Sequence, residues 1–103
     1  MQIDIQTRNF SLTDALHSHA ERRLRFALTC CADQIQRVVM RLSYSNGPHG
    51  GADKCCHLQV MLDGLSDVVV EDTEADLYIA INRAADRAGR TLLRKIDRQQ
   101  TLL

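Results

Sequence analysis

The sequence lacks the features that mark several protein classes. No apolar run approaches the roughly 20 residues that a helix needs to span a bilayer. The first residues alternate between polar and apolar side chains, which is not the pattern of a secretory signal. No internal repeat, linker or low-complexity segment interrupts the 103 residues, a length that suits one domain with a modest core. We therefore expect a single cytoplasmic domain over residues 1–103 with no membrane partner.

Signatures of catalysis are also missing. The sequence has no G-x-S-x-G nucleophile motif, no glycine loop ahead of a Lys-Ser/Thr pair and no H-E-x-x-H zinc motif. None of its four histidines belongs to one of these catalytic motifs. We predict that the protein is not an enzyme and uses no cofactor.

Aromatic side chains are scarce, at 4% of the residues. Proteins that bind single-stranded nucleic acid stack the bases on aromatic rings. A single-strand binding protein of that kind is therefore disfavoured.

Cysteines occur as two adjacent pairs, Cys30 with Cys31 and Cys55 with Cys56. Nothing indicates secretion, so reduced thiols are expected. Zinc sites usually place two or more residues between paired cysteines, and neighbours on a strand point to opposite faces, so we predict no metal site. Cys31 and Cys56 are expected to fill the core. A thiol-based redox sensor is an alternative function.

The zero net charge conceals strong segregation of charge along the chain. Residues 1–62 carry +2, residues 63–76 carry −6, and residues 77–98 carry +4. Local fields decide which partners a surface attracts, so this segregation is more informative than the average.

Periodicity predicts six elements. Alternation predicts strands at 2–7, 35–44, 54–62 and a short one at 68–71, and helical spacing predicts helices at 14–30 and 74–98. Thr13 is a good N-cap for the first helix, and Thr73 with Asp76 resembles a capping box for the second. The glycine-rich segment 45–53 is interpreted as a loop and "DGLSD" as a tight turn.

This order, β-α-β-β-β-α, predicts the fold class. The first two strands, joined by a helix, should be parallel neighbours with a right-handed crossover. The remaining strands should form an antiparallel meander. We expect an α+β fold in which both helices cover one face of a four-stranded mixed sheet.

Arginines recur along the last predicted helix at steps of 4, 3, 4 and 4 residues: Arg83, Arg87, Arg90, Arg94 and Arg98. At 100° per residue this arginine ladder falls within an arc of about 80°, away from the apolar stripe, and extends over roughly 22 Å. Arg outnumbers Lys by eleven to two in the chain. Because guanidinium groups match pairs of phosphate oxygens, the pattern favours a polyanion-binding face.

Two alternatives compete with a polyanion-binding face. One is a solvated helix face, because cations suit a helix C-terminus and Asp86 or Asp97 could pair with the neighbouring arginines. Helix polarity does not explain the narrow stripe, however. The other is a protein-interaction module, whose arginines bind an acidic protein partner or segment 63–76 of a second copy.

The first predicted helix adds three arginines in "ERRLRF". Arg22 and Arg25 should point outward, and Arg23 should lie nearer the core edge. If both helices lie side by side, their outer faces form one basic platform. Such a surface suits folded RNA, recognised through its phosphates and shape, and we expect no DNA partner.

The ordered motifs resemble the ribosome hibernation-promoting factor and ribosome-associated inhibitor family in its short form. The opening "MQIDIQTRNFSLTDALHSHAERRL" is similar to that family's first strand and helix. The segment "EADLYIAINRAADRAGRTLLRKIDR" is similar to its final helix, and "NGPHGGADKCC" to the loop of one subgroup. The similarity covers about residues 1–98.

The resemblance implies a fold like that of double-stranded RNA-binding domains and a role in silencing translation during stress or stationary phase. It implies binding to small-subunit rRNA in the channel that mRNA and tRNA occupy. Because the sequence ends at Leu103, we expect no C-terminal dimerisation domain, so ribosome pairing would need a separate dimerising factor.

The resemblance also implies which residues contact RNA. The positions that match the family's basic residues are Arg23, Arg25, Lys54, Arg87, Arg90, Arg94 and Arg98. Arg22 and Arg83 join the candidate RNA-binding set because of their places on the two helices.

Overall fold

A four-stranded mixed sheet forms one layer of the protein in a computed structural model, which describes residues 1–44 and 53–101. Its strands are β1 (Gln2–Thr7), β2 (Ile35–Tyr44), β3 (Lys54–Leu62) and β4 (Leu65–Glu74), in the spatial order β1-β2-β3-β4. β1 pairs in parallel with β2, and the other pairs are antiparallel. The predicted topology is confirmed. The expected loop at 45–53 lies largely outside the described residues.

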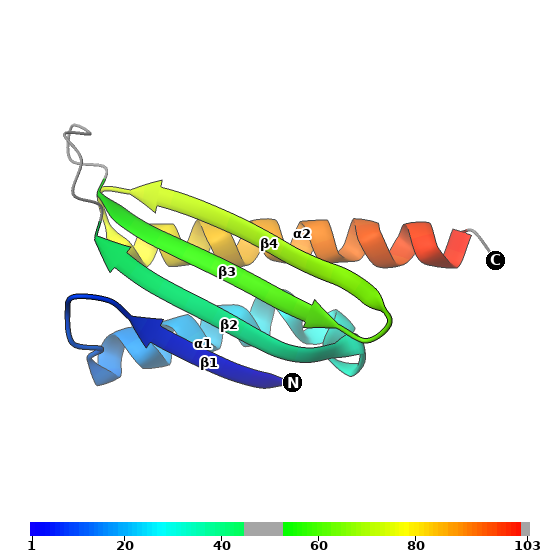
Figure 1. Ribbon diagram of the computed structural model, residues 1–103, viewed down its shortest axis with the longest axis horizontal. Helices are drawn as coiled ribbons and strands as arrows, with labels where there is room; N and C mark the ends of the chain where they lie inside the picture. The colour runs from blue at the N-terminus through cyan, green and yellow to red at the C-terminus, as the bar shows by residue number, and fades with distance from the viewer. Residues whose placement is uncertain (45–52, 102–103) are drawn as a thin grey trace.

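The second layer consists of α1 (Asp14–Leu28) and α2 (Leu77–Thr101), and a short 3-10 helix, η1 (Thr29–Gln34), follows α1. Both long helices cover the same face of the sheet (Figure 1). The predicted two-layer α+β architecture is therefore confirmed. Within the described residues, no helix combines the length and apolarity needed to cross a membrane.

α1 begins as predicted and ends earlier than predicted. The Leu16 amide donates to Thr13 Oγ1 at 3.1 Å, which satisfies one of the amides that a helix start leaves unpaired. The expected helix continued to residue 30, but the chain changes to the tighter 3-10 form at Thr29. Cys31 then leaves helical geometry, with φ −124° and ψ 17°. The result is a compact connection between α1 and β2.

β4 is longer than the predicted strand at 68–71, and α2 starts later than predicted. Thr73 lies within β4 and caps nothing. The cap is Asp76, whose carboxylate accepts from the Tyr78 amide at 2.8 Å and whose carbonyl accepts from the Ala80 amide at 3.0 Å. The acidic residues Glu71, Asp72 and Glu74 belong to β4, where they lie opposite His57, Cys56 and Lys54 of β3.

The core lies between the sheet and the two helices. Alternate residues of the strands and the apolar stripes of α1 and α2 meet there, and its largest fully buried side chains include Leu24, Met40, Leu42, Leu58 and Leu92. Cys31 and Cys56 are buried in this core, as predicted. No helix formed by residues 1–44 or 53–101 covers the opposite face of the sheet (Figure 1).

Gly89 allows the two helices to approach closely. A Cβ atom at this position would lie 2.8 Å from the carbonyl oxygen of Ala27 in α1. That is closer than van der Waals contact, and a backbone atom cannot move aside without shifting its helix. Gly89 thus fixes the spacing of the surface that the two helices present.

We expect Gly89→Ala to destabilise the fold even though alanine favours helix. Overpacking costs about 1–3 kcal/mol, while the gain in helix propensity is about 1 kcal/mol. The net loss of about 1 kcal/mol should lower Tm by roughly 5 °C for a domain of this size. Differential scanning calorimetry measures this shift. An unchanged or higher Tm would show that the helices are not in close contact at this point.

Candidate nucleic-acid interface

The arginine ladder occupies the exposed side of α2. The helix buries Ile81, Ala84, Ala88, Leu92 and Ile96 against the sheet, and the ladder lies on another side of the same helix. Its members are all exposed, namely Arg83, Arg87, Arg90, Arg94 and Arg98. α2 therefore presents a row of cations to solvent, and in Figure 1 this helix runs behind the sheet.

The first two arginines of the ladder are tied to β4. Arg83 Nε lies 3.5 Å from a Glu74 carboxylate oxygen, and Arg87 Nη1 lies 3.5 Å from Asp72 Oδ2. Arg87 Nη1 also donates to the Glu71 carbonyl at 3.1 Å. The acidic segment 63–76 thus neutralises part of the ladder within the molecule. These contacts explain why acidic residues extend β4.

Within the part of the chain that the structure describes, the last three arginines have no such partners. Among the described residues, no ion pair or hydrogen bond involves the side chains of Arg90, Arg94 or Arg98. Lys95 Nζ reaches Ser66 Oγ at 2.5 Å near the β3–β4 turn, and α2 continues past that turn (Figure 1). The uncompensated charge is therefore concentrated at the C-terminal part of α2.

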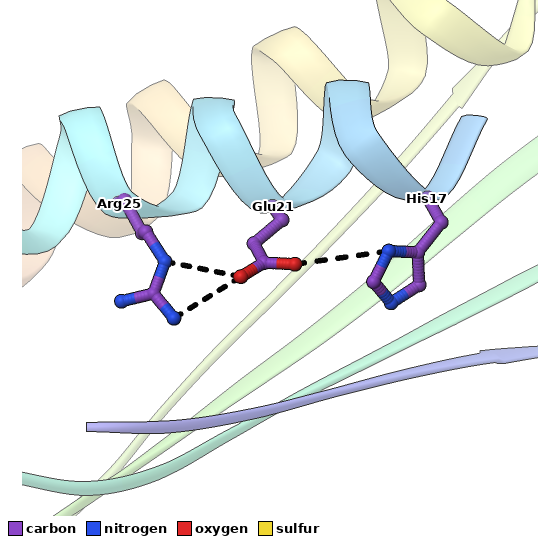
Figure 2. A network of polar contacts seen from close by, with 3 residues as sticks. All are labelled: His17, Glu21 and Arg25. Atoms are coloured by element: carbon purple, nitrogen blue, oxygen red, sulfur yellow. Dashed lines mark hydrogen bonds and ion pairs between the residues drawn. The ribbon is translucent and has the colours of Figure 1, made fainter. Parts of the chain in front are cut away.

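α1 adds two exposed arginines, as predicted. Arg22 makes no ion pair with another described residue. Arg25 donates to Glu21 Oε1 from Nε at 3.2 Å and from Nη2 at 3.1 Å, and Glu21 Oε2 lies 3.7 Å from His17 Nδ1 (Figure 2). Exposed pairs of this kind contribute about 0–1 kcal/mol, so a phosphate can displace Glu21 from Arg25 at little cost.

Arg23 bridges the two helices. Its Nη2 donates to Asp86 Oδ1 of α2 at 2.7 Å, and its Nε is buried without a hydrogen-bond partner. In the alternative of a solvated helix face, Asp86 could pair with arginines of its own helix, but its ion pair is with Arg23 of α1. Arg23 lies near the core edge, as predicted, and its guanidinium is less available to a ligand than those of Arg22 and Arg25. We interpret it as a residue that positions the platform.

Lys54 lies at the end of the sheet, beside the start of α2. Its Nζ donates to Asp53 Oδ1 at 2.6 Å and lies 4.8 Å from the centre of the Tyr44 ring. That hydrogen bond lowers the pKa of the Asp53 carboxyl. In the sheet, Lys54 is opposite Glu74, the partner of Arg83. Lys54 is thus at the N-terminal end of the ladder, away from its unpaired arginines.

A hydrophobic strip between the helices was missed from the sequence. Phe26 is 80% exposed and Leu93 is 44% exposed. They line a shallow groove of about 250 Å³ with Gly89 and Arg90. An exposed ring beside a guanidinium can stack on a nucleobase. The sequence does contain a signal for the exposure of Phe26. The buried positions of α1 are Leu16, Ala20, Leu24 and Leu28, and Phe26 does not fall on this helical spacing.

Within residues 1–44 and 53–101, no cluster of three or more His, Cys, Asp or Glu side chains could hold an ion.

Comparison of the sequence with protein-family models identifies the family of the chain. The family model for the Sigma 54 modulation protein / S30EA ribosomal protein matches residues 3–100, nearly the whole chain. The chain belongs to this family. The resemblance drawn from the sequence motifs is thereby confirmed. Members are ribosome-associated factors, and this S30EA-family protein is not an enzyme.

Two solved structures share the fold. The N-terminal domain of Protein Y from Thermus thermophilus is 33% identical, with a TM-score of 0.76 over 91% of this chain and 98% of that domain. A ribosomal subunit interface protein from Coxiella burnetii is 18% identical, with a TM-score of 0.79 over 94% of this chain and 99% of its own. At that identity the second likeness establishes the fold alone. No curated protein sequence matches the chain.

Proposed function

We propose that this protein binds the rRNA of the small ribosomal subunit and thereby silences translation. The observation that carries the proposal is the row of exposed arginines on α2, whose last three members have no acidic partner among the described residues. Membership of a ribosomal protein family makes rRNA the polyanion that fits best.

The binding chemistry is electrostatic. Guanidinium groups displace the counterions condensed on RNA, and each Arg fork can hold two phosphate oxygens. Such contacts fix the orientation of a protein on RNA without reading sequence. Arg90, Arg94, Arg98 and Arg22 would make the strongest contacts, because forming them breaks no internal ion pair. Arg83, Arg87, Arg25 and Lys54 would exchange an internal acidic partner for a phosphate.

The mode of inhibition we propose is exclusion. Bound in the channel for mRNA and tRNA, the domain would block both ligands physically, in the cytoplasm, under stress or in stationary phase. A separate dimerising factor is the partner that we propose for any pairing of ribosomes.

The rival function, binding of an acidic protein, is less well supported by the molecule. Segment 63–76 was a candidate acidic partner on a second copy. Asp72 and Glu74 are instead engaged with arginines of their own chain. A second copy would have to compete with those contacts.

Co-sedimentation with purified ribosomal subunits tests the proposal. We expect the protein to pellet with small subunits and not with large subunits. An excess of mRNA with bound tRNA should release it, because the three compete for one channel. Pelleting that is insensitive to mRNA and tRNA would refute the proposed location. A pull-down from lysate with and without ribonuclease separates the rival, because an acidic protein partner survives digestion and rRNA does not.

A further inference from the structure

Two Cys-Cys dipeptides with the same spacing have different geometries in this fold. Cys30 and Cys31 lie in η1, and their Sγ atoms are 3.5 Å apart. Cys55 and Cys56 lie on β3, where neighbouring side chains point to opposite faces of the sheet. Cys56 faces the helices and is fully buried, while Cys55 is half-buried on the other face. The fold thus brings only the first pair of sulfurs together.

The backbone at Cys31 explains this proximity. Successive residues of a regular helix point about 100° apart, which separates neighbouring side chains. Cys31 departs from helical geometry, with φ −124° and ψ 17°, at the kink within η1. Its thiol packs into the core while Cys30 stays exposed. The Cys30 sulfur is therefore accessible to a reagent in solution, and the buried Cys31 sulfur lies 3.5 Å from it.

We propose that Cys30 and Cys31 form a vicinal dithiol that hydrogen peroxide oxidises to an intramolecular disulfide. The Cys30 thiolate attacks one peroxide oxygen, the O–O bond breaks, and Cys30 becomes a sulfenic acid as hydroxide leaves. The Cys31 sulfur then attacks the Cys30 sulfur. The S–S bond forms, the S–O bond breaks, and the oxygen leaves as water with the Cys31 proton. Overall, the two thiols lose two electrons and two protons, and one peroxide becomes two waters.

The environments of the two thiols assign these roles. Burial, and a hydrogen bond with Cys30, raise the pKa of the Cys31 thiol to about 11. Cys31 is therefore a poor first nucleophile at neutral pH, because the thiolate is the reactive form. Cys30 is exposed and makes the first attack. A disulfide is about 2.05 Å long, so the sulfurs must approach by about 1.5 Å, a local change at the α1–β2 connection.

Mass spectrometry of the peroxide-treated native protein tests this proposal. After thiol alkylation, trypsin releases Cys30 and Cys31 in peptide 26–37, and Cys55 and Cys56 in peptide 55–83. We expect a loss of about 2 Da, reversible by reductant, in peptide 26–37 and not in peptide 55–83. Equal oxidation of both peptides, a disulfide between two chains, or only sulfinic acid at Cys30 would each overturn the proposal.

Phenylarsine oxide provides a test that needs no oxidation. Its arsenic bonds to two neighbouring thiols, whose protons leave with the arsenic-bound oxygen as water. We expect one arsenical per reduced native chain, lost in Cys30→Ser and retained in Cys55→Ser. Because Cys30 is exposed, its substitution leaves the core intact. Binding that persists in Cys30→Ser would contradict the assignment. Neither experiment involves ribosomes, so the outcome is independent of the proposed function.

Discussion

Replacing Arg90, Arg94 and Arg98 together by Gln is expected to weaken binding to the small ribosomal subunit about 100-fold, since each charged contact contributes at least about 1 kcal/mol. These side chains are exposed and have no ion-pair partner among the described residues, so the fold should not change. The slope of log affinity against log salt concentration should fall by about 2, because three phosphate contacts are lost. Filter binding or sedimentation at several salt concentrations measures both quantities.

The matched control removes the same charge from the open face of the sheet. Arg8, Arg37 and Arg41 are exposed, and Arg8 and Arg41 line a hollow on that face together with His57. Their replacement by Gln changes the net charge equally but leaves both helices untouched. We expect this control to bind within a few-fold of the unmodified protein. If both triple variants lose affinity to the same degree, net charge and not the ladder governs binding.

The sequence correctly predicted the ends of elements that depend on local chemistry. The predicted ends were wrong where contacts with other elements determine them. β1 matches its predicted bounds because alternation alone defines it, and α1 starts at its Thr13 cap. β4 was predicted too short because Asp and Glu are uncommon in strands. Hydrogen bonds with β3 and the arginines of α2 stabilise those acids, and neither contact is visible in a local window.

The candidate site shows the same division. The ladder follows from helical geometry and could be placed from spacing alone. Spacing could not show which arginines of the ladder are neutralised, because the partners of Arg83 and Arg87 lie on β4. Arg23 and Asp86 are 63 residues apart in the chain, and their contact depends on how closely the two helices pack. The sulfur contact between Cys30 and Cys31 depends on a kink that no residue pattern announces.

Cys56, which belongs neither to the arginine surface nor to the Cys30–Cys31 pair, should make the stability of the protein depend on pH. Burial, with smaller contributions from the charges of Cys55 and Asp72, raises the pKa of its thiol from 9.0 to about 12. The folded state therefore holds this proton more tightly than the unfolded state. Below about pH 9 the thiol is protonated in both states and its contribution is constant. As the pH rises from 9 towards 12, only the unfolded chain ionises and stability is lost.

Raising the pH from 8 to 11 in the presence of reductant should therefore destabilise the protein by about 2–3 kcal/mol through Cys56 alone, and lower Tm by on the order of 10 °C. Cys56→Ala should start from a lower Tm because of the cavity it leaves, yet lose less stability over this pH range. Cys55→Ala is the matched control, since it leaves Cys56 buried and should keep the alkaline loss. Urea unfolding at each pH gives the slope of the unfolding free energy against pH for the unmodified protein, Cys56→Ala and Cys55→Ala. Equal slopes for the unmodified protein and Cys56→Ala would contradict the prediction. They would mean that Cys56 ionises as easily in the folded state as in the unfolded chain. The packing of α2 against β3 would then be looser than the fold indicates.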